Sequence, residues 1–323
     1  MGRIAVPHEA LGPGREFDAI RAWLAAWGAS ARGIGDDAAI LDIPRGSRLV
    51  VSTDASVEGV HFRREWLTPR EVGYRACAAA LSDLAAMGAA PLGVLVAVSC
   101  PTSWRDDLAE VMAGAGDAAH ASGAPIIGGD TTGAGDAMRS ADGGALMLAI
   151  TVLGHCASPL TRAGAVIGDI IYVTGALGGP CAALTAWQHG AQPEPRHRAR
   201  FAAPEPRIAA GKIAAAARAH AAIDVSDGLA ADLRHVSAAS HVRIELDVDR
   251  VPVFPGATRD DALAGGEEYE LVIAAPSLAI AEFAADGIPL TAIGRVVAGA
   301  AEVIGLENGS RVALPEGYDH FSG

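Results

Sequence analysis

Lysine is almost missing from this chain of 323 residues, where Lys212 is the only one. A P-loop requires a GxxxxGK[ST] segment, and Lys212 is followed by Ile213, so the sequence contains no P-loop. Protein kinases require a strand lysine together with HRD and DFG motifs, which are also lacking. If the protein transfers phosphate, its positive charge must therefore come from arginine and from metal ions.

Paired cysteines and long apolar runs are lacking as well, and we expect no secretory signal. The four cysteines are isolated from one another in apolar surroundings, which favours buried thiols in a reduced cytoplasm: Cys77, Cys100, Cys156 and Cys181. The longest apolar runs, such as 92–98 and 145–153, are much shorter than a membrane span. Charged residues at Glu9, Arg15 and Glu16 leave no continuous apolar region of a secretory signal. We expect a cytoplasmic protein without a membrane-spanning helix.

Positive charge is scarce overall, and the formal net charge is −13. This balance argues against nonspecific binding to nucleic acid, because phosphate backbones are bound by Lys and Arg. Acidic residues nevertheless stand beside glycine-rich turns that suit phosphates. The two observations agree if divalent cations lie between the carboxylates and an anionic ligand. The alternative is that the negative balance only keeps the protein soluble.

Short acidic segments joined to Gly, Ser or Thr are what the sequence has instead. Aspartate is a usual ligand of hard cations, and small neighbours let backbone N–H groups approach a phosphate closely. Together the segments predict a multi-metal polyphosphate site: GIGDDAAIL (33–41), STDASVEGVHF (52–62), LSDLAAMGA (81–89), GGDTT (128–132), DVSDG (224–228) and GGEEYEL (265–271).

The first two segments are weak signals when taken singly. Asp36 and Asp37 follow a flexible turn and, in an extended segment, face opposite sides. Ser52, Thr53 and Asp54 are expected at the end of an apolar strand, where a hydroxyl and a carboxylate could share a cation. The competing interpretation of both segments is an ordinary capped turn.

The next two segments place a carboxylate on a regular element. Asp83 lies on an apolar helix, where it either faces solvent beside Ser82 or needs a partner, because an unpaired buried carboxylate is costly. Asp130 follows a short β-rich run and two glycines, at a position expected to be the end of a strand. Both positions suit a ligand.

The DVSDG segment is expected to begin a helix at Gly228. The N-terminus of that helix would offer N–H groups to an anion, with Asp224 and Asp227 on either side of Ser226. The alternative is that Ser226 or Asp227 is an ordinary N-cap. Recurrence of such segments, without a competing motif, favours a functional site over turns alone.

The length predicts two domains. We expect the boundary in the irregular segment 155–169 and a polar surface loop over 191–206, which contains four prolines. Hydrophobic patterns, glycines and prolines predict strands over 48–52, 92–99, 146–153, 170–174, 269–274 and 291–297, and helices over 69–87, 103–121, 181–189, 207–220 and 228–239.

In their order along the chain, the acidic segments resemble those of the thiamine-monophosphate kinase family. This family belongs to a superfamily that includes aminoimidazole ribonucleotide synthetase and selenophosphate synthetase. The resemblance also covers 160–175, PEPR (204–207) and GYDHF (317–321). It implies a two-domain α+β fold like that of aminoimidazole ribonucleotide synthetase. An N-terminal α/β domain over 1–154 would dimerise and bind metal and ATP, and a C-terminal α+β domain over 155–323 would complete the cleft.

The resemblance further implies ATP-dependent phosphorylation of thiamine monophosphate to thiamine diphosphate by a homodimer with several Mg²⁺ ions. By this resemblance Gly129, Arg162 and Ser226 would contact ATP, and His61, Glu267 and Tyr318 would line the thiamine monophosphate pocket. Asp54, Asp130 and Arg162 would carry the catalysis. Family members usually have GGED where this chain has Glu268. The implied metal ligands are Asp37, Ser52, Thr53, Asp54, Asp83, Asp130, Asp224 and Asp227.

Simple chemistry agrees with this assignment. The acceptor would be a phosphate oxygen with a second pKa of ~6, already ionised near neutral pH, so no general base is required. The obstacle is repulsion between polyanions: two unit charges ~4 Å apart repel by about 4 kcal/mol at an effective dielectric near 20. Metal ions held by dispersed aspartates would remove this repulsion, and Arg162 would neutralise further charge. Without the resemblance, the local sequence would favour a surface arginine for Arg162 and a structural histidine for His61.

Two other functions stay open at this point. One is an ATP-dependent synthetase of the same superfamily that phosphorylates an amide oxygen or selenide. A selenide enzyme would need a reactive Cys or selenocysteine near its N-terminus, and the first cysteine here is Cys77. The other is a non-catalytic regulator that binds Mg²⁺ or nucleotide, supported only by Glu268 and the segment 191–206.

Overall fold

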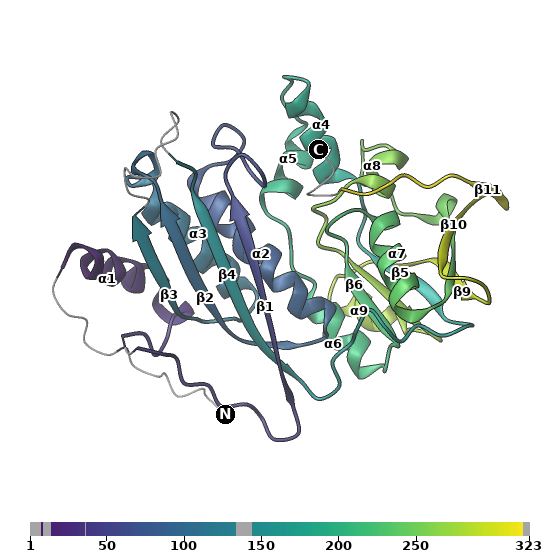
Figure 1. The fold of residues 1–323 in the computed structure, drawn as a ribbon, viewed down its shortest axis with the longest axis horizontal. Coiled ribbons are helices and arrows are strands. Elements are labelled where there is room, and N and C mark those ends of the chain that lie inside the picture. The colour runs from purple at the N-terminus through teal and green to yellow at the C-terminus, as the bar shows by residue number, and fades with distance from the viewer. Residues whose placement is uncertain (1–7, 9–13, 36, 134–143, 319–323) are drawn as a thin grey trace. The chain divides into compact units, whose positions relative to one another are not determined.

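The computed structural model describes residues 8, 14–35, 37–133 and 144–318, and it contains two sheets, one in each of two units (Figure 1). Unit 1 comprises Met1–Leu81 and Pro91–His155. Unit 2 comprises Ser82–Ala90 and Cys156–Gly323. Among the described residues, none of the helices has the length and apolar character needed to cross a membrane.

Unit 1 is built on a four-stranded sheet with the order β1-β4-β2-β3, with α2 and α3 behind it in Figure 1. The helices pack closely because Gly73 and Gly114 have no side chain; a Cβ at Gly73 would lie 1.7 Å from the Val111 carbonyl oxygen. Its elements are α1 (Arg15–Trp27), η1 (Gly28–Ser30), β1 (Arg48–Val57), α2 (Pro69–Ala86, of which the last five residues belong to unit 2), β2 (Ala90–Cys100), η2 (Thr102–Trp104), α3 (Leu108–Ala121), β3 (Ile126–Gly133) and β4 (Met147–Cys156).

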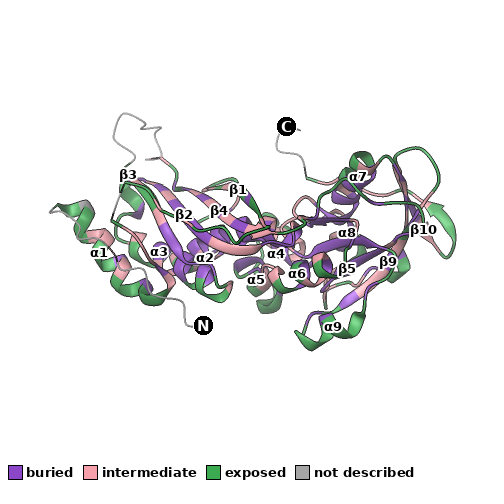
Figure 2. Ribbon diagram, turned by 90° about the horizontal axis from the view of Figure 1, so that it is seen from below, coloured by how far each residue is buried: buried purple, intermediate pink, exposed green. Residues whose placement is uncertain are grey.

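Unit 2 is a seven-stranded, mostly antiparallel sheet with the order β11-β10-β7-β9-β5-β8-β6. Every residue of β8 and all but the first of β5 are buried, and the strand labelled β5 is largely purple in Figure 2. Its elements are β5 (Ile170–Thr174), α4 (Gly179–Gln188), α5 (Pro195–Ala202), α6 (Ile208–Ala216), β6 (Ala221–Asp224), α7 (Leu229–Ser240), β7 (Arg243–Asp247), η4 (Val248–Arg250), α8 (Arg259–Ala264), β8 (Leu271–Ala275), α9 (Ile280–Ala285), β9 (Leu290–Val297), β10 (Glu302–Glu307) and β11 (Ser310–Val312).

The two faces of the unit 2 sheet have separate hydrophobic cores. Side chains alternate between the two faces along β5, so Ile171 and Val173 lie in the core shared with α7 and α8. Tyr172, between them, packs into the core shared with α6, α9 and the end of α2. Helices therefore cover both faces of this sheet, while the loops at the ends of its strands remain available for a site.

The expected α+β architecture is confirmed, and most predicted elements form within a few residues of their expected bounds. Two strands were predicted too short. β1 runs to Val57 and β3 to Gly133, so Asp54 and Asp130 lie inside strands, not at their ends. Polar residues can continue these strands because β1 and β3 are the edges of the sheet and are not buried on both sides.

The expectation of a surface loop over 191–206 is wrong in part. Pro195–Ala202 forms α5, with Pro195 at its start, where a missing N–H costs nothing. His197 and Phe201 are buried. The Phe201 ring packs edge-on against the Trp187 ring, with 5.3 Å between the ring centroids. The charged residues that favoured a loop occupy the other positions of a short amphipathic helix.

Candidate active site

Two of the acidic segments lie side by side in unit 2, at the end of β6 and the start of β8. These strands pair antiparallel, with Asp224 opposite Leu271. Beyond the pair, the backbone N–H of Glu267 donates to the Ser226 carbonyl at 2.8 Å, and that of Tyr269 donates to the Val225 carbonyl at 2.9 Å. Hydrogen bonding thus joins DVSDG (224–228) to GGEEYEL (265–271).

A third acidic segment reaches the same place through α2. The Ser82 hydroxyl donates to Oδ2 of Asp224 at 2.8 Å, and Ser82 is fully buried. This contact holds the last turn of α2 against the end of β6, so Asp83 is adjacent to a residue that touches Asp224. Asp83 is half-buried, between the two alternatives that the sequence left open. The structure thus gathers Asp83, Asp224 and Asp227 in one region of unit 2.

Asp232, which lies outside the acidic segments, anchors the DVSDG loop. This buried carboxylate accepts the backbone N–H groups of Ser226 at 3.1 Å and Asp227 at 3.2 Å. Burial, followed by the nearby charges of Asp224 and Asp227, raises the pKa of Asp232 to about 8. The N–H groups of Ser226 and Asp227, which precede the first turn of α7, are therefore bonded inside the protein.

The alternative interpretation of the DVSDG segment, a side-chain N-cap of α7, is not observed. Gly228 is the N-cap residue, and neither Ser226 nor Asp227 makes a capping bond through its side chain. Among the described residues, carboxylate and imidazole atoms of Asp227, Asp232 and His235 lie within 4.8 Å of one another, a spacing that can hold a metal ion. Asp227 is thus in a position to ligate a cation.

Two of the predicted substrate residues border this region. The backbone N–H of Tyr318 donates to the Asp227 carbonyl at 3.0 Å, and the Tyr318 ring is exposed. Glu267 has a φ of 67°, and Tyr269, whose hydroxyl donates to Glu267 Oε2 at 2.5 Å, has a φ of 55°. Non-glycine residues adopt this left-handed conformation only when their surroundings impose it, and such residues cluster at functional sites. Asp319–Phe321 of the GYDHF segment lie outside the described residues.

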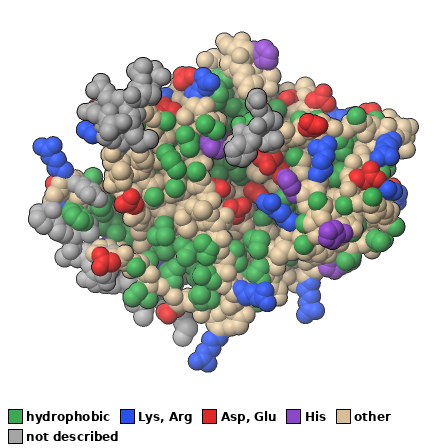
Figure 3. Space-filling view, in the orientation of Figure 1, with side chains coloured by type: hydrophobic (Ala, Val, Ile, Leu, Met, Phe, Trp, Pro, Cys, Tyr) green, Lys and Arg blue, Asp and Glu red, His purple; other side chains and the backbone are tan. Residues whose placement is uncertain are grey.

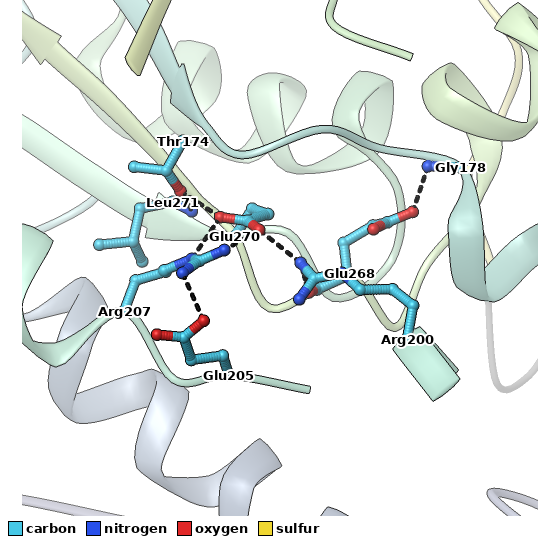
Figure 4. Close-up of polar contacts among 8 residues, drawn as sticks. All are labelled: Thr174, Gly178, Arg200, Glu205, Arg207, Glu268, Glu270 and Leu271. Atoms are coloured by element: carbon cyan, nitrogen blue, oxygen red, sulfur yellow. Dashed lines mark hydrogen bonds and ion pairs between the residues drawn. The ribbon is translucent and has the colours of Figure 1, made fainter. Parts of the chain in front are cut away.

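A buried ion-pair network supports the GGEEYEL segment from behind (Figure 4). Arg207 donates to both carboxylate oxygens of Glu270 at 2.7 Å, Arg200 donates to Oε1, and the Thr174 hydroxyl donates to Oε2. Burial opposes ionisation of Glu270, but Arg207 and Arg200 hold its pKa below the usual value. A charge so fully paired is structural, and it fixes the start of β8.

In unit 1, the metal ligands predicted on β1 divide between the two faces of the sheet. Ser52 and Asp54 share one face, which follows from their spacing of two residues. Thr53 is on the other face, where its hydroxyl bonds the hydroxyl of Thr151 on β4 at 3.0 Å. Within one chain, the Thr53 hydroxyl therefore does not share an ion with Ser52 and Asp54.

Gly129 and Asp130 lie on β3, at the opposite edge of this sheet from β1. A Cβ at Gly129 would lie 1.9 Å from the Val96 carbonyl oxygen, so only glycine fits there. Asp130 is paired with Ala97 of β2 and accepts a hydrogen bond from the Thr132 hydroxyl at 3.2 Å. Three strand spacings, roughly 14 Å, separate β3 from β1, so Asp130 and Asp54 do not chelate one ion within a single chain.

His61 belongs to a tight turn after β1. Its Nδ1 accepts the Val57 N–H at 3.1 Å, which places the ring proton of neutral His61 on Nε2. The turn is anchored by Glu58, whose Oε2 accepts from Trp104 Nε1 at 2.8 Å and from the Leu146 N–H at 3.1 Å. Glu58 therefore fixes the position of His61, a role that was not predicted.

Two predicted residues are exposed to solvent. Arg162 follows Thr161, whose carbonyl accepts the N–H of Ala222 on β6 at 3.0 Å, two positions before Asp224. The Arg162 carbonyl accepts from the Ser240 hydroxyl at the end of α7. Asp37 is exposed in an irregular segment, and Asp36 lies outside the described residues.

Four residues that were not predicted from the sequence act through partners elsewhere in the chain. Ser82, Asp232, Glu58 and Glu270 each support a predicted site residue across a turn or between segments. Three of these residues lie within the acidic segments: Ser82, Glu58 and Glu270. Their place in a segment was the signal in the sequence that could have indicated a role. Their partners could not be identified without the fold.

The chain matches known protein families and relatives over most of its length. The family model for the AIR synthase related protein N-terminal domain matches residues 35–156, and that for the C-terminal domain matches residues 166–307. The thiamine-monophosphate kinase of Rhodopirellula baltica is 36% identical over 314 residues, covering 90% of this chain and 91% of the relative.

Solved structures agree with these sequence matches. The thiamine-monophosphate kinase of Stenotrophomonas maltophilia superposes with a TM-score of 0.77 at 34% identity, covering 94% of this chain and 98% of that one. AaThiL, complexed with AMPPCP and TMP, gives a TM-score of 0.74 at 26% identity over 97% of this chain and 100% of its own. This chain is therefore a member of the thiamine-monophosphate kinase family, within the AIR synthase related proteins.

Proposed function

We propose that this enzyme transfers the γ-phosphoryl group of ATP directly to the phosphate of thiamine monophosphate, forming thiamine diphosphate and ADP. The main support is the convergence of three acidic segments around Asp224 in a chain whose relatives are thiamine-monophosphate kinases. The complex of AaThiL with AMPPCP and TMP supports the same two substrates. The alternative synthetase and regulator functions have no comparable support.

The donor groups of the site fit magnesium ions. They are carboxylate and hydroxyl oxygens, the ligands that this hard cation takes, and Asp224 is already oriented by Ser82. When bound, Mg²⁺ neutralises charge between the phosphates of ATP and those of the acceptor. We assign Asp83, Asp224 and Asp227 of unit 2 to this role, and in unit 1 Asp37, Ser52, Thr53, Asp54 and Asp130.

The remaining assignments concern the two substrates. Gly129, Arg162 and Ser226 would contact ATP, with Arg162 also balancing charge on the transferred group. The Nε2–H of His61 would donate to thiamine monophosphate, and Glu267 and Tyr318 would line its pocket. No side chain needs to remove a proton, because the acceptor phosphate is ionised near neutral pH. Residues 1–154 would supply the metal and ATP ligands, and residues 155–323 would complete the site.

A homodimer would cover the open face of the unit 1 sheet. Apolar residues on this face are exposed: Leu49 to 46%, Val51 to 54% and Met147 to 40%. Figure 3 shows hydrophobic side chains gathered over these strands. Exposed apolar patches of this kind mark protein interfaces. We expect a dimer by sedimentation and its dissociation by Val51→Asp; a wild-type monomer would contradict this proposal.

The four cysteines are consistent with a reducing compartment. All are free thiols, and burial raises the pKa of Cys77 to about 12. A thiol so protonated is unreactive, as expected of a packing residue in the cytoplasm, where we place the enzyme.

The function is tested by coupled ADP release with ATP, Mg²⁺ and thiamine monophosphate, with the product identified by ³¹P NMR. A kinase gives ADP and thiamine diphosphate in equal amounts, with the new phosphoryl group bonded to a phosphate. A synthetase would phosphorylate a different acceptor. Tight ATP binding without ADP release at saturating thiamine monophosphate would favour the regulator.

A further inference from the structure

Glu268 is a buried carboxylate in the middle of the GGEEYEL segment. Residues 268 and 270 are buried, whereas the side chains of Glu267 and Tyr269 are half-buried. Oε1 of Glu268 accepts the backbone N–H of Gly178 (Figure 4). Gly178 is the N-cap residue of α4, so a side chain 90 residues away makes the bond that a local glutamate makes in a capping box.

The backbone of Glu268 is held as firmly as its side chain. Its carbonyl accepts from Arg200 at 3.1 Å, while the same guanidinium pairs with Glu270. Its N–H donates to the Val225 carbonyl at 3.2 Å. Contacts from α4, α5 and the DVSDG loop therefore converge on this one residue.

The residues on either side of Glu268 have the unfavourable backbone conformation. Glu267 and Tyr269 both have positive φ angles, of 67° and 55°. Non-glycine residues leave this conformation unless neighbouring contacts hold them in it. The bond from Gly178 to Glu268 lies between the two strained residues, where it opposes relaxation of both.

We propose that Glu268 is a positioning residue: by accepting the Gly178 N–H, it holds residues 265–269 in the conformation that presents Glu267, with its Tyr269 partner, to the substrate. This inference rests on the proposed function, because it takes Glu267 as a thiamine monophosphate contact. It also gives a role to the position where the sequence departs from the GGED of its family.

The test compares three substitutions. Glu268→Met keeps the length of the side chain and removes both acceptor oxygens. Glu268→Gln keeps the acceptor and the shape, and is the conservative rescue. Ile304→Ala removes buried apolar contacts on β10, five positions from β6 in the sheet, and controls for a general loss of stability.

Amide hydrogen exchange tests the positioning contact independently of activity. In Glu268→Met we expect faster exchange at Gly178 and at the N–H groups of Glu267, Glu268 and Tyr269, with protection retained in Glu268→Gln. Wild-type exchange at these amides in Glu268→Met would overturn the proposal. If Glu268→Met does not fold, Glu268→Asp draws the acceptor back by one methylene and should show a smaller increase at the same amides.

Kinetics then test the effect on the substrate. Loss of one hydrogen bond predicts a KM for thiamine monophosphate raised about ten-fold in Glu268→Met, with the KM for ATP little changed and near-wild-type values in Glu268→Gln. Equal changes for both substrates, as in Ile304→Ala, would overturn the proposal. A wild-type enzyme that forms no thiamine diphosphate would refute the proposed function, while the exchange result would still decide whether Glu268 fixes the loop.

Discussion

The Oγ atom of Ser82 lies 2.8 Å from Oδ2 of Asp224, although 142 residues separate them in the sequence. The bond is buried, and it joins the LSDLAAMGA segment to DVSDG. A hydroxyl that donates to a carboxylate orients it, as outer-shell partners do in metal sites. Asp224, which we propose as a metal ligand, is therefore held in place by Ser82.

Removing this hydroxyl should weaken metal binding more than it weakens the fold. We expect Ser82→Ala to raise the Mg²⁺ concentration for half-maximal activity roughly ten-fold. Ser237→Ala is the matched control, because the buried Ser237 hydroxyl donates to the Val242 carbonyl away from the acidic segments. Both variants should lose about 1 kcal/mol of unfolding free energy. Identical Mg²⁺ titrations for the two variants would contradict an orienting role of Ser82.

Gly175 makes room for the carboxylate of Glu270. A Cβ at this position would lie 2.1 Å from Glu270 Oε1, and the φ of Gly175 is 62°. Gly175→Ala should therefore destabilise unit 2 by at least about 2 kcal/mol in denaturant unfolding. Gly190→Ala is the control, since Gly190 has a similar φ of 72° but open space around it. Equal losses in both variants would show that backbone strain alone, without the contact to Glu270, is responsible.

Stability should depend on pH through Glu268. Burial raises the pKa of Glu268 to about 8, from 4.5 when exposed. The folded protein therefore binds a proton that the unfolded chain has released between these values. This contribution to stability is complete below pH 4.5 and is lost as the pH rises to about 8, by at most about 1.4 kcal/mol per pH unit.

Glu268→Gln isolates this contribution because glutamine does not ionise. The unfolding free energy of the variant relative to the wild type should increase steadily from pH 5 to pH 8, as measured by urea denaturation at each pH. A difference that stays constant over this range would show that Glu268 is ionised throughout.

The dispersed aspartates should be needed for turnover but not for folding. We expect Asp54→Asn, Asp83→Asn and Asp130→Asn each to abolish thiamine diphosphate formation while circular dichroism and unfolding midpoints stay near wild type. Asp286→Asn, an exposed substitution at the end of α9, should leave activity unchanged. Normal activity in all three variants would refute the multi-metal mechanism.

Local sequence patterns predicted the elements better than their junctions. Strand 170–174 was predicted at its observed bounds because its apolar residues are buried on both faces. Edge strands β1 and β3 were predicted too short, since small and polar residues continue them past their apolar part. Helix α5 was missed because its proline and its charges outweigh the two apolar positions that it buries.

Site residues were predictable where a motif carries them, and unpredictable where a distant partner defines them. The acidic segments indicated Asp224 and Asp227 directly as candidate ligands, which stays a prediction. Nothing local indicates that Ser82 bonds Asp224, that Asp232 accepts two N–H groups of the DVSDG loop, or that Glu268 reaches Gly178. Thr53 points away from Ser52 and Asp54 because neighbouring residues of a strand face opposite sides, which follows from the sequence only once β1 is known to continue past Asp54.

Direct transfer between two phosphates is the central claim, and the fate of the γ-phosphoryl group tests it most directly. The enzyme would be incubated with Mg²⁺, thiamine monophosphate and ATP labelled with ³²P at the γ-position, and the products separated over the first turnovers. We expect the label in the terminal phosphate of thiamine diphosphate, in amounts equal to the ADP formed. Label in inorganic phosphate, or retained on the protein while unlabelled thiamine monophosphate persists, would contradict the account.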